Sequence, residues 1–415
     1  MNHLSFYLSS HMSLGGKGRG SASGVAVAVV GIALAIVVMM LSVSVMTGFR
    51  DEIRRKITGF ESQLTIAPYS AGNDDVKGLK LSDFKDVEQL LPQGSEMHLS
   101  MRQPAIFKTT ETFTGIVVKG MDAEADWDFI RSNLTEGTIP DFRADSTFFH
   151  MVVSRSIADR LGIGLGDRVD TYFLGSGVYR ARRLKVAGIY DTHFSDFDRH
   201  MIYSGLPMLR QVASMADSTA TLIEINRLPS DEAIDTTATA ITRLLQARSY
   251  ADPKATVYAV ANIHQTAALY FNWLSLLDTN VVVILVIMAV LSSLTLVSSL
   301  FILILRRVNM IGILKALGAS NGLIRHTFIL LTLRILILGL LIGNAIALGV
   351  ILIQRATGFI PLDPEAYYLD HVPMALDPTA ILLLNLAVIL VAALVLIIPS
   401  SVIATIPPSK AINYE

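Results

Sequence analysis

The chain has 415 residues, of which 52% are hydrophobic and only 17% are charged, whereas an ordinary soluble domain has about 25% charged residues. Its net charge of -1 and the absence of a basic, aromatic-rich tail give no support to nucleic-acid binding. The absence of cysteine excludes disulfides, thiolate zinc sites and cysteine nucleophiles, and it leaves the redox compartment open.

Four long apolar runs hold most of the hydrophobic excess, and each can cross a bilayer, which takes about 20 such residues in a helix. The first run carries no charge and is longer than the roughly 7–15 apolar residues of a cleaved signal peptide, so we expect an uncleaved anchor. The sequence thus predicts a membrane protein with four transmembrane α-helices, one before and three after a large domain. The expected helices are residues 24–46, 273–305, 327–354 and 379–403.

Residues 47–272 have the mixed composition of soluble protein, and we predict one large α+β domain there. Short runs rich in β-branched residues and bounded by Gly, Pro or Asp predict strands. These runs are residues 63–66, 114–119, 151–154, 168–174, 183–189, 201–203, 221–225 and 256–260. Helical patterns fall at residues 48–57, 82–91, 155–161, 206–215 and 230–248.

The loops between the last three helices differ in charge. Residues 306–326 carry basic side chains and no acid, whereas residues 355–378 carry four acids and one arginine. Since cytoplasmic loops of membrane proteins are enriched in Lys and Arg, we expect the basic loop inside the cell and the acidic loop outside. Both terminal segments, residues 1–23 and 404–415, are then cytoplasmic, and the α+β domain lies outside.

The basic loop cannot continue a transmembrane helix, because each of its charges would cost a few kcal/mol in lipid. We expect residues 306–323 to lie along the membrane surface. By composition this segment is either a connecting loop with an interfacial helix or a docking helix for a cytoplasmic partner.

Motifs along the chain resemble those of one family. The run IGILKALGAS at residues 311–320 resembles the coupling helix of FtsX-like or MacB-type permeases of ATP-binding-cassette transporters. Phe49, Glu52 and Ile53 after the first span, and the ending PSKAINYE, fit the same family. The run LDPEAYYLDHVP at residues 362–373 is most similar to the lipoprotein-releasing (LolC/LolE-type) permeases. The outer domain agrees through GIVVKGMD, LGIGLGD and LKVAGIY, which begin at residues 115, 161 and 184.

This resemblance implies a multi-pass protein of the bacterial inner membrane whose MacB-like domain is periplasmic. It implies that the chain pairs with a second copy or a paralogue, above a pair of separate nucleotide-binding subunits that hold ATP and Mg²⁺. The chain itself is then non-catalytic and binds no cofactor; it extracts lipoproteins and releases them toward a periplasmic carrier. The coupling residues implied are Ile311, Gly312, Ile313, Leu314, Lys315, Ala316, Leu317, Gly318 and Ala319.

One stretch of the chain looks like a phosphate-binding loop, the Gly-rich run at residues 15–21. It lacks the Gly-Lys-Ser/Thr spacing of a phosphate loop and precedes a membrane span instead of following a strand. We therefore expect ATP hydrolysis to come from another chain.

In lipoprotein-releasing permeases, a periplasmic hairpin recruits the soluble carrier. The matching stretch here, residues 171–183, closes on Gly-Ser-Gly and is short, which puts carrier binding in doubt. Tyr172, Phe173, Tyr179 and Arg180 are the candidate partner contacts, and an ordinary hairpin is the alternative. The candidate cargo cavity is assigned from position alone, at the outer end of the first span. Its residues are Met39, Met40, Val43 and Met46, with lipid contact or packing as the alternative.

Carboxylates and imidazoles gather at residues 191–200, a composition that invites a metal site. Their spacing is irregular and Arg199 would repel a cation, so we expect a solvated loop and no metal. Asn344 and Asn385 fall within the third and fourth spans, where we expect them to hydrogen-bond between helices.

Two other functions stay open. A MacB-type efflux permease would drive a peptide or toxin through a periplasmic partner by mechanical strokes. An FtsX-like signalling protein would control a cell-wall hydrolase and transport nothing.

Overall fold

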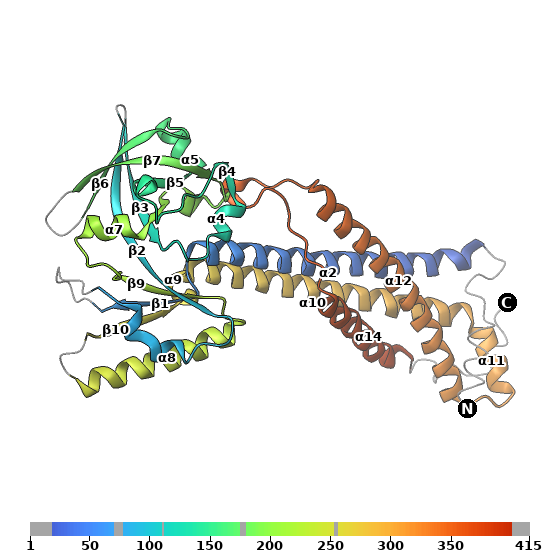
Figure 1. Ribbon diagram of the computed structural model, residues 1–415. Coiled ribbons are helices and arrows are strands. Elements are labelled where there is room, and N and C mark those ends of the chain that lie inside the picture. Colours follow the sequence, from blue (N-terminus) through green and yellow to red (C-terminus); the bar gives the residue numbers. More distant parts are fainter. Residues whose placement is uncertain (1–18, 70–77, 110–111, 175–179, 253–255, 401–415) are drawn as a thin grey trace. The chain divides into compact units, whose positions relative to one another are not determined.

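A computed structural model describes residues 19–69, 78–109, 112–174, 180–252 and 256–400. It divides into two compact units (Figure 1). The helical unit comprises Met1–Asp51, Trp273–Pro361 and His371–Glu415. The sheet unit comprises Glu52–Asn272 and Leu362–Asp370.

The helical unit is built on four long helices: α2 Arg19–Phe60, α10 Ala268–Arg306, α12 Asn321–Thr357 and α14 Pro378–Ser400. Each is long and apolar enough to cross a membrane. The protein is therefore a multi-pass membrane protein, and the predicted fold class is confirmed. The helical pattern predicted at residues 48–57 is also confirmed, because α2 runs on without a break to Phe60.

Two glycines let α12 pack closely against α2. A Cβ on Gly343 would lie 2.8 Å from the Ala33 carbonyl oxygen, and one on Gly339 would lie 2.7 Å from Ile32. Small residues at such spacing allow membrane helices to approach backbone to backbone. The apolar core beside this contact includes Ile32, Ile36, Met39, Leu296, Leu300, Phe328, Ile335 and Leu336.

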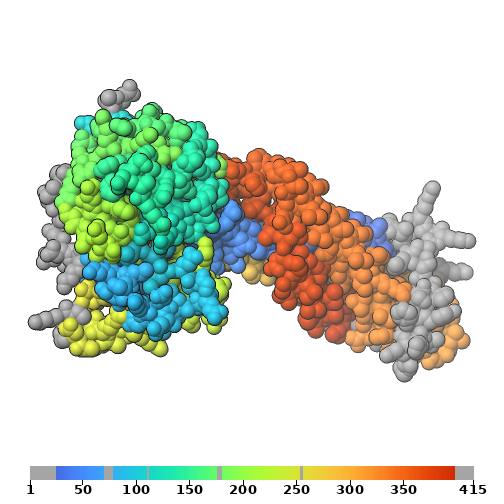
Figure 2. Space-filling view, viewed as in Figure 1, coloured from blue at the N-terminus to red at the C-terminus, as the bar shows by residue number. Residues whose placement is uncertain are grey.

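The sheet unit contains ten strands in the order β10-β1-β9-β2-β3-β8-β5-β7-β4, with β6 pairing both β2 and β7. Six of them, β2, β3, β8, β5, β7 and β6, therefore form a closed ring. Figure 2 shows the surface of the sheet unit, which is cyan and green over one part and blue and yellow over the other. The strands are β1 Leu64–Pro68, β2 Glu96–Lys108, β3 Phe113–Met121, β4 Leu134–Gly137, β5 His150–Ser154, β6 Arg168–Phe173, β7 Arg180–Tyr190, β8 Met201–Gly205, β9 Leu222–Asn226 and β10 Tyr258–Asn262.

Side chains alternate along β6, as expected where one face of a sheet is buried, whereas β8 is buried along its whole length. In β6, Val169, Thr171 and Phe173 are buried and their neighbours are not. The helices of this unit include α5 Arg155–Leu161, α7 Leu206–Ala213 and α8 Asp231–Ala251. Shorter helical turns are η1 Leu81–Phe84, α3 Lys85–Glu88, α4 Asp128–Ser132, η2 Asp145–Thr147, α6 Ser195–Asp198, α9 Ile263–Thr266 and α13 Pro364–Tyr367.

Candidate functional site

The basic loop folds into a short helix, α11 Val308–Ala316, between α10 and α12. Ile311 is fully buried in the helical core, and Leu314 packs partly against the same core. Ile313 and Leu317 are 54% and 80% exposed, and Ala316 is exposed between them. Positions three and four residues apart lie on one side of a helix. The segment therefore presents a small apolar face, formed by Ile313, Ala316 and Leu317, which we call the α11 face.

A tight turn fixes the end of α11. Gly318 has φ +89°, a left-handed conformation that favours glycine, and the Ala319 N–H donates to the Leu314 carbonyl at 2.9 Å. The Ser320 hydroxyl then caps α12 by accepting from the Leu323 N–H. The basic loop thus contains a helix whose end is fixed by a hydrogen-bonded turn, whereas docking on a cytoplasmic partner stays a prediction.

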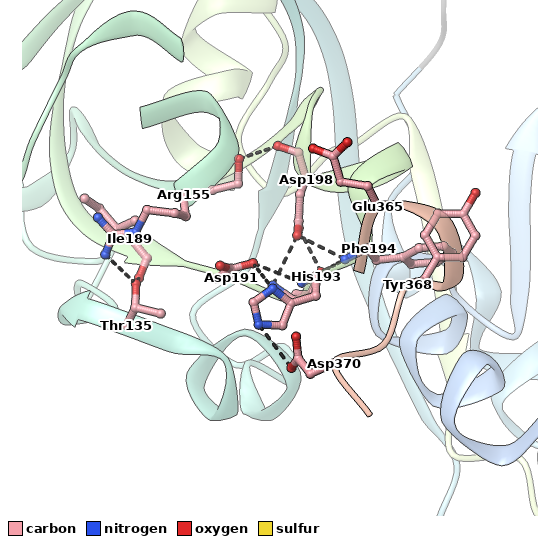
Figure 3. Close-up of polar contacts among 12 residues, drawn as sticks. Thr135, Arg155, Ile189, Asp191, His193, Phe194, Asp198, Glu365, Tyr368 and Asp370 are labelled. Atoms are coloured by element: carbon pink, nitrogen blue, oxygen red, sulfur yellow. Dashed lines mark hydrogen bonds and ion pairs between the residues drawn. The ribbon is translucent and has the colours of Figure 1, made fainter. Parts of the chain in front are cut away.

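The loop of residues 191–200 is packed into the sheet unit (Figure 3). Thr192, Phe194 and Asp198 are each at most 3% exposed. The Asp198 carboxylate accepts hydrogen bonds from the Thr192 hydroxyl at 2.8 Å and from the Thr192 and Phe194 N–H groups at 3.2 Å. Burial raises the pKa of Asp198 to about 6, against the opposing effect of these donors. The expectation of a solvated loop was wrong here, because a buried carboxylate holds this loop in shape.

Segments far apart in sequence meet at this loop. Asp196 accepts a hydrogen bond from the Tyr270 hydroxyl at 2.9 Å and another from the Tyr368 hydroxyl at 3.0 Å. The Phe194 ring makes edge contacts with both tyrosine rings, at centroid distances of 5.2 Å and 4.8 Å. The start of α10 and the segment Leu362–Asp370 are thereby held to the same short helix, α6.

Lys56, on the last turns of α2, completes this arrangement. Its Nζ donates to the Thr192 carbonyl at 2.5 Å and to the Tyr368 carbonyl at 2.6 Å, and the residue is 7% exposed. We call Lys56, Thr192, Phe194, Asp196, Tyr270 and Tyr368 the junction cluster. Close polar contacts flank it: His193 lies 3.1 Å from Asp191 and 3.3 Å from Asp370, and Arg199 lies 3.8 Å from Glu365.

The sequence analysis missed Lys56, although its position carried a clue. Ile53, Ile57 and Phe60 are all fully buried, and Lys56 falls on the same helix face at the same spacing. A lysine within such an apolar stripe needs buried acceptors, which the two carbonyls supply. The carbonyl of Tyr368 comes from a distant part of the chain, so the partner itself could not be foreseen.

A second buried charge cluster lies inside the sheet unit. Glu224 is 1% exposed, and its carboxylate lies 3.0 Å from Lys119, 3.3 Å from His98 and 3.6 Å from Arg102. Burial alone would raise the pKa of Glu224, but these three basic groups together hold it well below its usual range. Arg102 also donates to both oxygens of Glu61 at 2.7 Å.

This cluster borders a cavity of about 570 Å³ whose lining includes the end of α2 and α4. The cavity wall carries acids and bases together, so it suits ordered water. Across the described parts of the chain, no group of three or more His, Cys, Asp or Glu side chains is arranged to hold a metal ion.

The predicted hairpin is an antiparallel pair of β6 and β7, with Phe173 opposite Arg180. Phe173 is 1% exposed inside the ring, so it supports the core and cannot contact a partner as predicted. Arg180 donates to the Gln211 and Val212 carbonyls at the end of α7. Tyr172 is half-buried, and Tyr179 lies outside the described residues. Partner binding by the rest of the hairpin stays a prediction.

The four candidate cargo residues lie along α2. Met39 and Met40 are each 1% exposed, and Met40 packs in a cluster with Ala347 and Ile351 of α12. Met46 is 7% exposed and Val43 is half-buried. In this conformation the methionines belong to the helical core, so cargo contact requires the helices to part and stays a prediction.

The comparisons with known proteins cover most of the chain. A family model described as "MacB-like periplasmic core domain" matches residues 25–244, and "FtsX-like permease C-terminal" matches residues 282–408. The lipoprotein-releasing system transmembrane protein LolC of Xylella fastidiosa (strain 9a5c) is 24% identical over 400 residues, which are 90% of this chain and 89% of that protein.

Two solved structures are also similar. The extracellular domain of the noncanonic ABC-type transporter YknZ from Gram-positive bacteria is 17% identical, with 48% of this chain and 100% of that one covered and a TM-score of 0.33. The periplasmic region of MacB from Actinobacillus actinomycetemcomitans is 15% identical, with 52% and 96% covered and a TM-score of 0.35. The family models, whose matches together span both units, carry the assignment. The chain belongs to the FtsX/MacB-type permeases of ABC transporters, with a MacB-like core domain between its first and second membrane helices.

Proposed function

We propose that this chain is the permease subunit of an ATP-driven transporter that extracts lipoproteins from the bacterial inner membrane and releases them toward a periplasmic carrier. The observation that carries the proposal is the similarity to LolC, which extends over 90% of this chain and so is not confined to its membrane helices. The name of that relative describes a lipoprotein-releasing system.

The charges of the loops support one orientation of the chain in the membrane. With the basic loop inside, α11 and both termini are cytoplasmic and the sheet unit is periplasmic. A separate nucleotide-binding subunit would hold ATP and Mg²⁺, and the α11 face would be its docking surface. The transporter would contain two permeases, either two copies of this chain or this chain with a paralogue.

The composition of the spans suits an apolar cargo. Each of the four helices contains a long, strongly apolar stretch, which leaves little polar surface for a solute channel. Acyl chains of a lipoprotein could instead enter sideways from the bilayer between α2 and α10. Met39, Met40 and Met46 would then line the opened cavity, because methionine side chains adapt readily to irregular apolar surfaces.

The test begins with purification of the tagged chain from its own cells in mild detergent, followed by mass spectrometry of the co-purifying proteins and lipidated peptides. We expect an ATPase subunit together with triacylated lipoproteins, which leave on addition of ATP. An ATPase with an adaptor protein and no lipoprotein would replace this proposal with peptide or toxin efflux. A cell-wall hydrolase in that place would replace it with signalling.

A variant of the α11 face sharpens the test. Leu317→Asp places a charge at a position whose side chain is 80% exposed, so the chain should still fold. The charge should prevent the α11 face from docking in an apolar groove of the nucleotide-binding subunit. We expect loss of ATP-driven release with the chain still in the membrane. Leu317→Met, which keeps an apolar side chain of similar size, is the matched control and should behave like the unmodified protein.

A further inference from the structure

The segment Leu362–Asp370 belongs to a different unit from the chain on either side of it. In sequence it connects α12 to α14, yet it packs as part of the sheet unit, while Pro361 and His371 belong to the helical unit. Within the sheet unit Tyr368 contacts two separate segments, α2 through Lys56 and the loop of residues 191–200 through Asp196 and Phe194.

We propose that Lys56 and Asp196 position the segment Leu362–Asp370 so that it moves as one body with the sheet unit. It then links movement of the periplasmic domain to the third and fourth membrane helices during transport. This inference rests on the proposed transport function, and it assigns Lys56 a positioning role in the cycle.

Lys56 makes this docking specific. A buried ammonium group is costly unless hydrogen bonds replace its water, and the two bonds to Lys56 go to main-chain carbonyls on different segments. Withdrawal of the segment would remove the Tyr368 carbonyl and leave the charge under-satisfied. Charge-assisted bonds are about twice as strong as neutral ones, so the docked position is strongly favoured.

The backbone conformation of Tyr368 is part of this contact. Its φ of +60° ends the short helix α13 in a left-handed turn. A non-glycine residue in that conformation costs free energy, which the surrounding contacts must offset. Here its carbonyl, its hydroxyl and its ring are all engaged, by Lys56, Asp196 and Phe194 respectively.

The base of the segment passes movement on to both helices. Within the segment, the Leu362 N–H donates to the Asp370 carbonyl at 2.9 Å. Within the helical unit, the Val372 N–H donates to the Ile360 carbonyl at 3.1 Å, and Gln354 of α12 bonds both of these residues. The chain that enters the segment and the chain that leaves it are therefore hydrogen-bonded to each other at two positions. Only residues 358–361 separate α12 from the segment. This connection is too short for the segment to move far without moving the end of α12.

The experiment uses spin labels, since the chain has no cysteine of its own. Ala366→Cys places one label on the segment and Glu232→Cys places the other on α8, both at exposed positions of the sheet unit. Their distance distribution is measured by pulsed electron paramagnetic resonance on the complete transporter in lipid nanodiscs. ATP turnover and lipoprotein release are measured on the same preparations.

We expect a narrow distribution in the unmodified protein, a broad one in Lys56→Met and a narrow one again in Lys56→Arg, which can still donate to both carbonyls. Lipoprotein released per ATP hydrolysed should fall about tenfold or more in Lys56→Met, the population change expected from losing charged hydrogen bonds. Basal ATP turnover should stay unchanged. Tyr368→Phe removes only the hydrogen bond to Asp196, so it should broaden the distance distribution less. It takes the place of Lys56→Met in the experiment if that variant does not assemble.

A narrow distribution in both Lys56→Met and Tyr368→Phe would overturn the positioning role. A broad distribution with unchanged release per ATP would overturn the link to transport. If the unmodified transporter releases no lipoprotein, the proposed function fails instead, and the distance measurement still decides whether Lys56 positions the segment.

Discussion

Asn344 of α12 and Asn385 of α14 hydrogen-bond to each other in both directions, with Nδ2 to Oδ1 distances of 2.7 Å and 3.0 Å. Each amide also donates to the carbonyl four residues earlier in its own helix. The pair satisfies its own polar groups in an apolar surrounding, and the predicted contact between helices is confirmed. It joins two helices and does not mark a polar pathway.

We expect Asn344→Leu to destabilise the helical unit by about 0.5–2 kcal/mol, because Asn385 loses its partner in a region without water. Asn385→Leu should cost a similar amount. The double variant should cost less than the sum, since no polar group is then left unpaired. Thermal unfolding in detergent, followed by circular dichroism, gives the three differences, and strictly additive values would show that the pair does not interact.

The glycines of α12 give a second prediction, with a control in the same helix. A Cβ at Gly343 would lie 2.8 Å from both the Ala33 carbonyl oxygen and Ile36 Cβ, and the carbonyl is main chain that cannot turn aside. A Cβ at Gly349 meets no atom within 4 Å. We expect Gly343→Ala to lower the melting temperature, and Gly349→Ala to leave it unchanged or raise it, since alanine favours a helix by about 1 kcal/mol. Equal effects of the two changes would mean that α2 and α12 do not pack this closely.

Local sequence patterns were sufficient for most elements. The predicted strands at residues 114–119, 151–154 and 168–174 coincide with β3, β5 and β6, and the predicted helix at residues 155–161 is α5. These segments combine β-branched or periodic apolar residues with Gly or Ser at their ends, so local preference and tertiary packing agree.

The strand β2 was missed because Pro104 interrupts it, and proline cannot donate a hydrogen bond within a sheet. The structure shows why proline is tolerated there. On one side of β2, the pairing with β9 ends at Ser100 and the pairing with β6 begins at Ala105. Pro104 therefore lies where β2 changes partners, a place that depends on the three-dimensional arrangement and not on the neighbouring sequence.

The junction cluster was beyond prediction for a similar reason. Residues 191–200 are as polar as a surface loop, and their burial depends on residues from α2, α10 and the segment Leu362–Asp370. Two of these contacts, those of Lys56, use main-chain carbonyls, which carry no sequence signature. By contrast, α11 was predictable because its charge and its place between two apolar runs were both visible.

The buried pair of Glu224 and Lys119 leads to a third prediction. Glu224→Gln leaves the buried Lys119 without its counter-charge, whereas Arg102 keeps Glu61, so we expect a loss of about 3–5 kcal/mol in the free energy of unfolding of the sheet unit. The double change Glu224→Leu with Lys119→Met should recover much of that loss, because apolar groups of similar volume replace the pair.

The matched control is Glu124→Gln, the same chemical change at a carboxylate that is 85% exposed and paired with Arg143. Surface ion pairs contribute about 0–1 kcal/mol, so this variant should unfold nearly as the unmodified protein does. Unfolding in urea can be followed through the fluorescence of Trp127, which is 5% exposed within the sheet unit. If Glu224→Gln lowered the free energy of unfolding as little as Glu124→Gln does, the charge of Glu224 would not stabilise the buried cluster.

Asp198 predicts a pH dependence with a definite sign. Its pKa in the folded protein is about 6, against 3.8 for an ordinary aspartate, so the folded state binds the proton more tightly than the unfolded state. By linkage, this residue makes the sheet unit less stable as pH rises from about 3 to 7, by about 3 kcal/mol in total, and has no further effect above about pH 7.

In Asp198→Asn this contribution is absent. We expect the difference in unfolding free energy between the unmodified protein and Asp198→Asn to shift by about 2 kcal/mol in favour of the unmodified protein as pH falls from 6.5 to 4. Urea unfolding at several pH values measures it. The constant cost of replacing an acceptor oxygen by an amide group cancels, because the comparison uses the slope with pH. Parallel pH profiles of the unfolding free energy for the two proteins would contradict the raised pKa of Asp198. They would mean that the hydrogen bonds from Thr192 and Phe194 fully replace those that the carboxylate makes to water in the unfolded state.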